Sequence, residues 1–253
     1  VLKNIEQLSV KLADRMDIFG FLNLQLAVKN DEVYMLEANP RSSRSIPFIA
    51  KATGVPLVDL GVQGMLKKSK DQLLDHPKDW KAMPFVCVKG VVFPFKKFQE
   101  ADTILGPEMK STGESMGKGK TYSEALFKAY VSTHYTMPYE GEVFMSLREK
   151  DKEDLFDVAE QLIDMGYSIS ATQGTASYLK EKGLPCLVVK KVSEGRPHCV
   201  DRIRSGKVAL VINTTSGKVS IDASFSIRRS CIEYSIPCLT EADAARSFVV
   251  AMK

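Results

Sequence analysis

The chain has 253 residues, of which 44% are hydrophobic and 26% are charged, and its formal net charge is +4. This composition is ordinary for a globular protein with room for two domains, and it excludes a disordered chain. Lysine and arginine form no dense block, so the small positive charge predicts a solvated surface and no nucleic-acid partner.

The cysteines and histidines form no metal-binding pattern. The five cysteines include no CxxC pair, and the three histidines are far apart. This pattern favours a reducing, cytoplasmic setting. No apolar run approaches the length of a membrane span, so we expect no membrane partner. The opening Val-Leu-Lys-Asn-Ile-Glu resembles neither a signal peptide nor an initiator-methionine start, and we expect the chain to begin inside something larger.

The first part of the chain predicts a helix followed by a β-hairpin. Apolar residues recur at helical spacing over 3–19. Two apolar, strand-like runs at 22–28 and 33–38 flank the turn residues at 29–32. Further along we expect helices at 46–53 and 56–67, a polar loop or irregular helix at 68–82, a strand at 85–93, and a helix to about 131 opened by the capping-box spacing of Thr121 to Glu124.

The stretch 134–141 predicts a linker, because regular strand–helix alternation begins after it. Five short strands separated by helices favour a mostly parallel, doubly wound α/β sheet. We therefore expect an α+β unit at 1–137 and an α/β unit at 138–253. The strands are expected at 142–147, 167–172, 186–189, 208–212 and 236–239, and the helices at 151–165, up to 183, around 200–203, at 227–234 and from 241.

Three oxygen-bearing side chains are predicted to share one face of the hairpin. A turn at Asn30-Asp31 places Gln25 approximately opposite Glu37, and Asn39 lies two residues further along the same strand. Hard cations such as Mg²⁺ take oxygen ligands of this kind. Arg41 and Arg44 follow at once, and their guanidinium groups suit phosphate. A merely solvated polar face of a hairpin explains the same spacing.

The run 36–44, which reads Leu-Glu-Ala-Asn-Pro-Arg-Ser-Ser-Arg, resembles the E-x-N-x-R signature of ATP-grasp enzymes. The runs 47–57 and 105–114 are similar to those of the carbamoyl phosphate synthetase large-subunit family. The resemblance implies the C-terminal half of an ATP-grasp domain that phosphorylates carbamate to carbamoyl phosphate, for pyrimidine and arginine biosynthesis.

By that resemblance, Gln25, Glu37 and Asn39 would bind Mg²⁺ or Mn²⁺ with ATP, and Arg41 and Arg44 would contact the phosphates or the acyl phosphate. The resemblance also implies two protein partners: a small glutamine amidotransferase subunit and the remainder of the large subunit. The front of an ATP-grasp unit, with its Gly-rich lid, is not in this sequence, so we expect the 253 residues alone to be inactive as a ligase.

The predicted parallel sheet collects polar residues at the carboxyl ends of its strands, where doubly wound folds bind ligands. Hydroxyls, lysines and helix-start N–H groups together form an anion pocket. Helix capping by the threonines, with solvated lysines, explains each residue singly. The residues at the strand ends are Lys152, Thr172, Thr175, Lys191, Asn213 and Thr215.

The runs 171–176, 194–198, 212–217 and 227–230 resemble the methylglyoxal-synthase-like domain at the C-terminus of the same large subunit. That domain binds allosteric effectors, typically nucleoside monophosphates such as UMP or IMP. The resemblance implies that the six residues just named line the pocket. Thr240 matches a ligand of the family's ornithine site, but Gly90 stands where ornithine-responsive members have a glutamate.

Two alternatives remain open in function. The chain could act as a ligand-binding regulatory module without catalysis of its own. It could also be a methylglyoxal synthase, but enzymes of that family have a catalytic carboxylate in a Gly-Gly-Asp motif in the loop after the third strand. This chain reads Gly195-Arg196-Pro197 there and lacks that general base.

Overall fold

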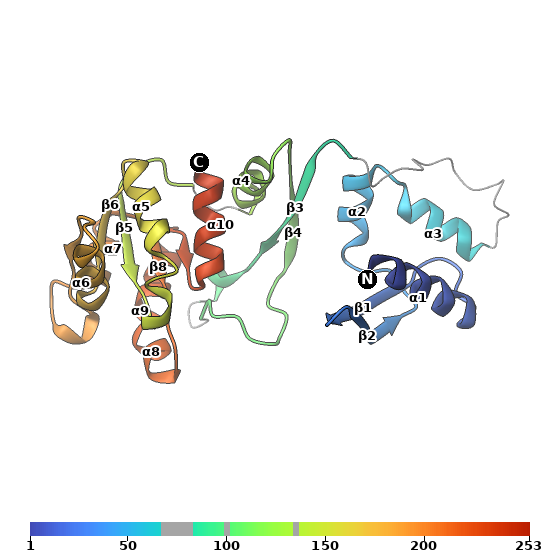
Figure 1. Cartoon of the computed structure of the whole chain (residues 1–253), viewed down its shortest axis with the longest axis horizontal. Coiled ribbons are helices and arrows are strands. Elements are labelled where there is room, and N and C mark those ends of the chain that lie inside the picture. Colours follow the sequence, from blue (N-terminus) through green and yellow to red (C-terminus); the bar gives the residue numbers. More distant parts are fainter. Residues whose placement is uncertain (67–82, 99–101, 134–136) are drawn as a thin grey trace. The chain divides into compact units, whose positions relative to one another are not determined.

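The computed structural model describes residues 1–66, 83–98, 102–133 and 137–253 (Figure 1). The chain folds as two compact units, residues 1–84 and 85–253. This division by packing differs from the predicted domain boundary between 137 and 138, which remains a prediction. The predicted irregular stretch at 68–82 and part of the predicted linker at 134–141 lie outside the described residues.

The first unit consists of a helix, a hairpin and a helix pair, as predicted. Helix α1 (Leu2–Arg15) ends four residues before the predicted position, because Asp17 adopts a positive φ of 49°. In the hairpin, Asn30 and Asp31 both have positive φ, which suits a tight two-residue turn. The remaining elements are β1 (Asn23–Lys29), β2 (Glu32–Asn39), α2 (Ile46–Thr53) and α3 (Leu57–Met65).

The second unit begins with a two-stranded antiparallel ribbon covered by a helix. Strand β3 (Val86–Val92) pairs with β4 (Gly113–Gly119), and α4 (Tyr122–Ser132) packs on both. The sequence did not predict β4, because its glycines are typical of loops. The helix explains them: a Cβ on Gly117 would lie 1.9 Å from the carbonyl oxygen of Ala125. Close packing of α4 therefore requires glycine here.

Five parallel strands form the sheet of the second unit, in the order β7-β6-β5-β8-β9. This confirms the predicted doubly wound α/β fold, with the strand order reversing beside β5. The strands are β5 (Glu142–Ser146), β6 (Ser168–Ala171), β7 (Leu187–Val188), β8 (Val208–Asn213) and β9 (Cys238–Leu239).

Helices cover both faces of this sheet. The sequence missed the short α8 and placed the start of α5 too early, because residues 149–155 form a short 3₁₀ helix and a turn first. The helices are α5 (Phe156–Asp164), α6 (Gln173–Glu181), α7 (Cys199–Arg204), α8 (Lys218–Ala223), α9 (Phe225–Glu233) and α10 (Ala242–Met252), with 3₁₀ turns η3 (Phe95–Lys97), η4 (Glu149–Asp151) and η5 (Val192–Glu194).

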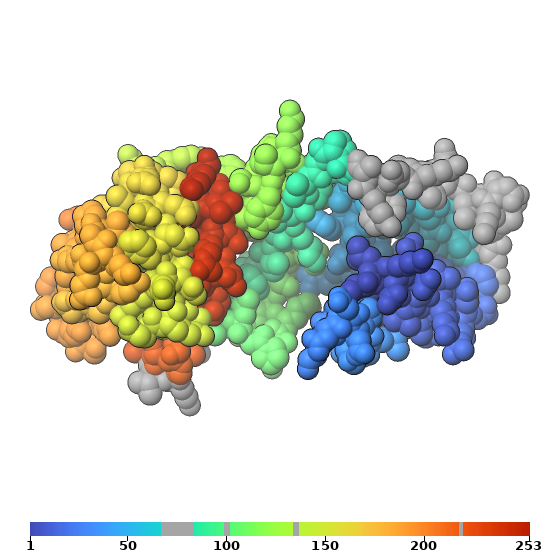
Figure 2. All heavy atoms as spheres, in the orientation of Figure 1, coloured from blue at the N-terminus to red at the C-terminus, as the bar shows by residue number. Residues whose placement is uncertain are grey.

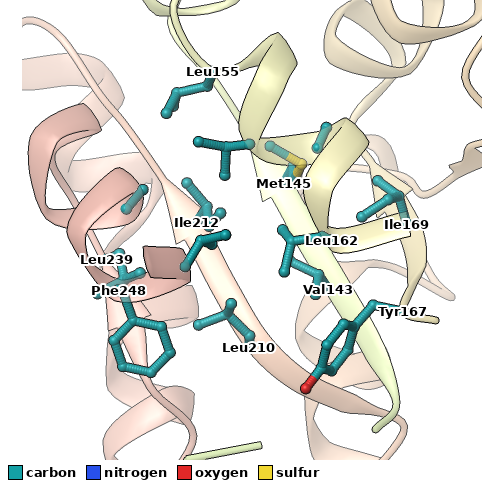
Figure 3. Close-up of a cluster of buried hydrophobic side chains, with 14 of the residues drawn as sticks. Val143, Met145, Leu155, Leu162, Tyr167, Ile169, Leu210, Ile212, Leu239 and Phe248 are labelled. Atoms are coloured by element: carbon teal, nitrogen blue, oxygen red, sulfur yellow. The ribbon is translucent and has the colours of Figure 1, made fainter. Parts of the chain in front are cut away.

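Alternate residues of each central strand face opposite cores. Val143 and Met145 of β5 join one buried cluster with Leu210 and Ile212 of β8 (Figure 3). Phe144, between them, joins the cluster on the other face. A sheet buried on both faces is expected for parallel strands connected by helices.

Helix α10 links the sheet to the β3–β4 ribbon. It packs on α5 and on α4, and in Figure 2 its atoms (red) lie between yellow and green ones. The ring of Phe248 on α10 meets the ring of Tyr130 on α4 edge to face, with centroids 4.8 Å apart. The ribbon and the sheet therefore share one core.

Candidate effector cleft and ATP-site residues

A cleft of about 720 Å³ opens at the carboxyl edge of the parallel sheet. It lies where β5, β6 and β8 end, which is the ligand position expected for a doubly wound fold. Five of the seven predicted effector residues line it: Lys152, Thr172, Thr175, Lys191 and Thr215. The lining is rich in further hydroxyl groups, from Ser146, Ser193, Thr214, Ser216, Ser220 and Ser224.

The charged residues that line the cleft are three basic ones, Arg148, Lys152 and Lys191, and one acidic one, Glu149. Lys152 lies in the turn after η4 and does not open a helix as predicted. Its side chain is nearly buried, and its Nζ donates to Glu149 Oε2 at 2.6 Å. The excess of positive charge makes the cleft suitable for an anion.

Neither predicted threonine of α6 uses its hydroxyl as a helix cap. Thr172 occupies the N-cap position, but its Oγ1 lies 3.5 Å from Ser146 Oγ and makes no cap hydrogen bond. Thr175 Oγ1 accepts a hydrogen bond of 3.0 Å from the backbone N–H of Leu147. Both side chains connect β6 and α6 to the end of β5. The alternative of simple capping is therefore wrong for this pair.

Asn213 ends β8 and is fully buried, but it is not part of the cleft lining. Neither its Oδ1 nor its Nδ2 has a hydrogen-bond partner within the described part of the chain. Buried amide groups are nearly always paired, so this side chain is available for a further partner. Its neighbours Thr214 and Thr215 do reach the cleft.

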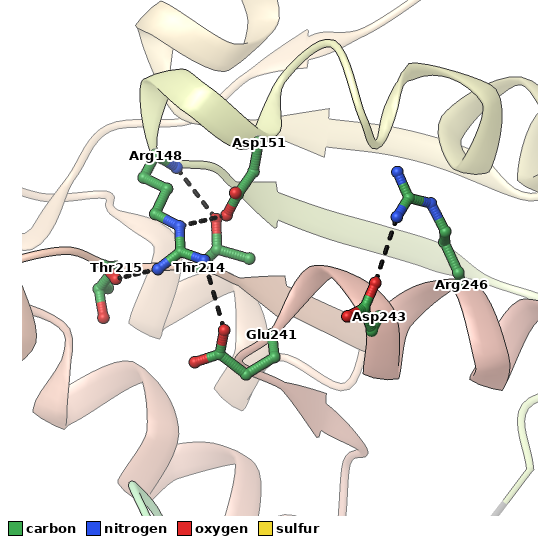
Figure 4. A network of polar contacts seen from close by, with 7 residues as sticks. All are labelled: Arg148, Asp151, Thr214, Thr215, Glu241, Asp243 and Arg246. Atoms are coloured by element: carbon green, nitrogen blue, oxygen red, sulfur yellow. Dashed lines mark hydrogen bonds and ion pairs between the residues drawn. The ribbon is translucent and has the colours of Figure 1, made fainter. Parts of the chain in front are cut away.

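Arg148 organises the edge of the cleft and was missed by the sequence reasoning (Figure 4). Its backbone N–H donates to Thr214 Oγ1 at 3.0 Å, and its Nη1 donates to the carbonyl oxygen of Thr215 at 3.1 Å. The guanidinium also pairs with Asp151 and with Glu241. A basic residue directly after a predicted strand was the available signal, but its partners are distant in sequence.

Thr240 and Gly90, the two positions compared with the family's ornithine site, are not part of the cleft lining. Thr240 follows β9 and does not line the cleft. Gly90 lies in β3, where an added Cβ would be 3.0 Å from the carbonyl oxygen of Ala129 and 2.8 Å from Thr133 Cγ2. A larger side chain at this position therefore requires the end of α4 to move.

The hairpin of the first unit has the predicted register. Gln25 pairs with Glu37, and Asn23 pairs with Asn39. Leu36 is skipped in the register, so a β-bulge lies directly beside Glu37. Bulges are common next to active sites, where they redirect a side chain. This register puts Gln25, Glu37 and Asn39 on the same face of the hairpin.

These three residues fit a divalent cation. They offer one carboxylate and two amide oxygens, and Gln25 and Glu37 are exposed. Mg²⁺ typically takes one or two carboxylates and completes its shell with phosphates and water. Arg41 and Arg44 lie beyond the end of β2 and are exposed.

A second cleft, of about 490 Å³, is lined only by residues of α1, so it is a helix surface. No cluster of three or more His, Cys, Asp or Glu side chains suited to a metal occurs among the described residues. None of the helices in the described ranges combines the length and apolar character of a membrane span.

Two family models match the chain. The carbamoyl-phosphate synthase L chain, ATP binding domain matches residues 1–68, and the MGS-like domain matches residues 154–240. The first match contains the hairpin with Glu37 and the two arginines. The second contains the carboxyl ends of β6 and β8, which border the cleft.

Curated relatives match over the whole chain. The carbamoyl phosphate synthase large chain, C-terminal section of Methanocaldococcus jannaschii is 40% identical over 100% of this chain and 42% of its own length. The corresponding section of Aquifex aeolicus is 39% identical over 100% of this chain and 50% of its own length. The large chain of Myxococcus xanthus is 42% identical over 100% of this chain and 23% of its own length.

This chain therefore spans half or less of the length of these relatives. The two domain matches, the full-length similarity and the fold agree with one another. The chain belongs to the carbamoyl phosphate synthase large-chain family and corresponds to its C-terminal part, with the end of an ATP-binding domain followed by an MGS-like domain.

Proposed function

We propose that the cleft of the second unit is an allosteric site for a nucleoside monophosphate such as UMP or IMP. The main support for this proposal is that one cleft, at the carboxyl edge of the sheet, is lined by Lys152, Thr172, Thr175, Lys191 and Thr215. Ammonium groups and hydroxyls recognise a phosphate group. The cleft volume of about 720 Å³ is within the range of small-molecule sites.

Asn213 supplies a second reason for a polar ligand. Its two unpaired amide atoms lie next to Thr214 and Thr215, which line the cleft. A buried donor or acceptor without a partner costs about 1–3 kcal/mol. A ligand that reaches this amide recovers part of that cost and so gains affinity. The base or ribose of a nucleotide carries suitable groups.

The test is calorimetric titration of this chain with UMP, IMP and inorganic phosphate. Lys191→Ala is the test variant, because Lys191 lines the cleft and is exposed, so the fold does not depend on it. Lys190→Ala is the matched control, since Lys190 is exposed but lies outside the lining. We expect Lys191→Ala to weaken nucleotide binding about tenfold or more and Lys190→Ala to leave it unchanged.

Binding of phosphate and both nucleotides with equal affinity would contradict a nucleotide site and indicate a general anion site. An unchanged affinity in Lys191→Ala would contradict the residue assignment. The methylglyoxal synthase alternative requires a carboxylate base in the cleft. The only acidic residue among those lining it is Glu149, which is paired with Lys152.

For the first unit, we propose that Gln25, Glu37 and Asn39 hold Mg²⁺ or Mn²⁺ and that Arg41 and Arg44 contact phosphate. The metal, when bound, would neutralise charge on the phosphates of ATP. The arginines add fixed positive charge beside the transferred group. The reaction of the whole enzyme would be ATP-dependent phosphorylation of carbamate, with ammonia supplied by a small glutamine amidotransferase subunit and the rest of the large chain completing the site. A cytoplasmic setting belongs to the same proposal.

The metal assignment is tested with Mn²⁺ and ATP in the complete large chain. Water-proton relaxation enhancement reports the bound metal, and Glu37→Gln removes its only carboxylate ligand on the hairpin. We expect Glu37→Gln to reduce the affinity for Mn²⁺–ATP about tenfold or more, while Glu6→Gln on the exposed face of α1 has no effect. Equal affinities in the two variants would remove Glu37 from the site.

A further inference from the structure

Arg228 on α9 is a fully buried charged side chain, with 1% of its surface exposed. Its Nε donates to Asp102 Oδ1 at 2.6 Å, and its Nη2 donates to Asp102 Oδ2. Asp102 belongs to the connection between β3 and β4, of which residues 93–98 and 102–112 are described. A two-pronged ion pair therefore joins the doubly wound sheet to the ribbon that precedes it.

Neighbouring contacts hold the same connection. Nη1 of Arg229 donates to the carbonyl oxygen of Phe98 at 2.9 Å and to that of Phe95 at 3.4 Å. Lys96 Nζ donates to Ser235 Oγ, just after α9, at 3.2 Å. Helix α9 and the residues just after it thus hold the β3–β4 connection through several polar contacts.

The start of the same helix forms part of the cleft wall. Ser224 and Ile227 line the cleft, and Ile227 directly precedes Arg228. From α8, Ser220 and Ala223 also line it. The Nη2 group that pairs with Asp102 also donates to the carbonyl oxygen of Ile221 at 2.8 Å. A single guanidinium therefore connects the cleft wall to the β3–β4 connection.

Separating the Arg228 guanidinium from the Asp102 carboxylate would leave a buried charge without its partner. A buried guanidinium without its carboxylate is far more costly than one that is paired, so the elements move together or the pair breaks. Burial of the Asp102 carboxyl raises its pKa, but its hydrogen bonds and charge attraction with Arg228 outweigh this effect and lower the pKa overall. The carboxylate is therefore ionised at neutral pH, as the pair requires.

We propose that the Arg228–Asp102 pair is the coupling clamp through which occupancy of the cleft reaches the β3–β4 ribbon. A ligand that displaces α8 or α9 shifts the guanidinium, and the guanidinium shifts the connection that leads into β4. By thermodynamic linkage, a change in the ribbon alters the affinity of the cleft by the same factor. The inference rests on the proposed function, because it requires a ligand in the cleft. Arg228 acts as a positioning residue and does not line the cleft itself.

The clamp is tested by hydrogen exchange of the full chain, with and without saturating UMP or IMP. We expect the wild type to change its amide protection in β3 and β4 when the ligand binds. Asp102→Asn keeps the shape of the side chain and removes its charge. It should bind the same ligand within about threefold, because Asp102 is outside the cleft lining, and lose the response in the ribbon. Arg204→Gln removes an exposed pair with Glu233 and is the matched control.

Each outcome separates the two proposals. If Asp102→Asn binds ligand and the ribbon still responds as in the wild type, the clamp is overturned and the effector site stands. If the wild type binds neither nucleotide, both proposals fail. Arg228→Lys, which retains the charge without the two-pronged geometry, replaces Asp102→Asn if that variant unfolds. It should reduce the response of the ribbon at least severalfold, and a full response in this variant would also overturn the clamp.

Discussion

The two units of this chain differ in how they bury their side chains. In the first unit, the described residues that are buried are Thr53, Val55 and Gly61. The second unit has two buried clusters, one on each face of its parallel sheet. Both units contain clear secondary structure, so regular elements do not by themselves imply a core. Stability comes mainly from the apolar surface that tertiary packing removes from water.

The same contrast separates the two proposed sites. The hairpin displays Gln25, Glu37 and the arginines on an exposed surface. The cleft instead draws on side chains from many parts of a packed fold, including the nearly buried Lys152, Thr172 and Thr175. Exposed groups can be changed without disturbing the fold, whereas groups in the cleft are held by their packing.

Truncating a side chain in the buried core of the second unit should have the largest effect on stability. Leu210→Ala removes a fully buried side chain from β8, and we expect it to lower the free energy of unfolding by about 2–5 kcal/mol. Denaturant unfolding, followed by a probe in the second unit, measures this loss. Leu210→Met keeps the volume and should cost less than about 1.5 kcal/mol. A small loss in Leu210→Ala would mean that the cluster relaxes around the cavity.

Loss of a helix cap should have an intermediate effect. Thr121 Oγ1 accepts a hydrogen bond of 3.2 Å from the backbone N–H of Glu124, as the capping-box spacing predicted. Thr121→Ala should destabilise the second unit by about 1 kcal/mol. Ser123→Ala, in the same turn, is the comparison variant and should cost less. Within residues 1–66, no helix has a side-chain cap hydrogen bond, so the first unit offers no counterpart.

Truncation in the hairpin should have the smallest effect. Leu36 lies at the β-bulge and is 67% exposed, so Leu36→Ala should change the free energy of unfolding of this chain by less than about 0.5 kcal/mol. Equilibrium unfolding of the same preparation used for Leu210→Ala gives a direct comparison. A loss of several kcal/mol would show that Leu36 is covered in solution, and it would remove the contrast between the two units.

Local pattern was sufficient for much of this protein. The alternation of strands and helices after residue 141 predicted all five strands of the parallel sheet, because each strand is a short apolar run between polar turns. The Asn30-Asp31 turn set the register next to it and so placed Gln25 near Glu37, but the direct pairing of these two residues depends on the β-bulge at Leu36. The strand ends also predicted five residues of the cleft lining, since parallel strands deliver their carboxyl ends to one edge.

Tertiary structure alone decided the remaining features. Strand β4 was missed because its glycines are dictated by the packing of α4 against it, and the sequence of the strand itself does not reveal that contact. The partners of Arg148, at Thr215 and Glu241, and of Arg228, at Asp102, are distant along the chain. Periodicity and turn chemistry describe neighbours in sequence, whereas the cost of burying a charge selects partners in space. The sequence by itself therefore determined the parallel sheet and the polar residues at its carboxyl edge, whereas tertiary packing decided β4 and the contacts between segments distant along the chain.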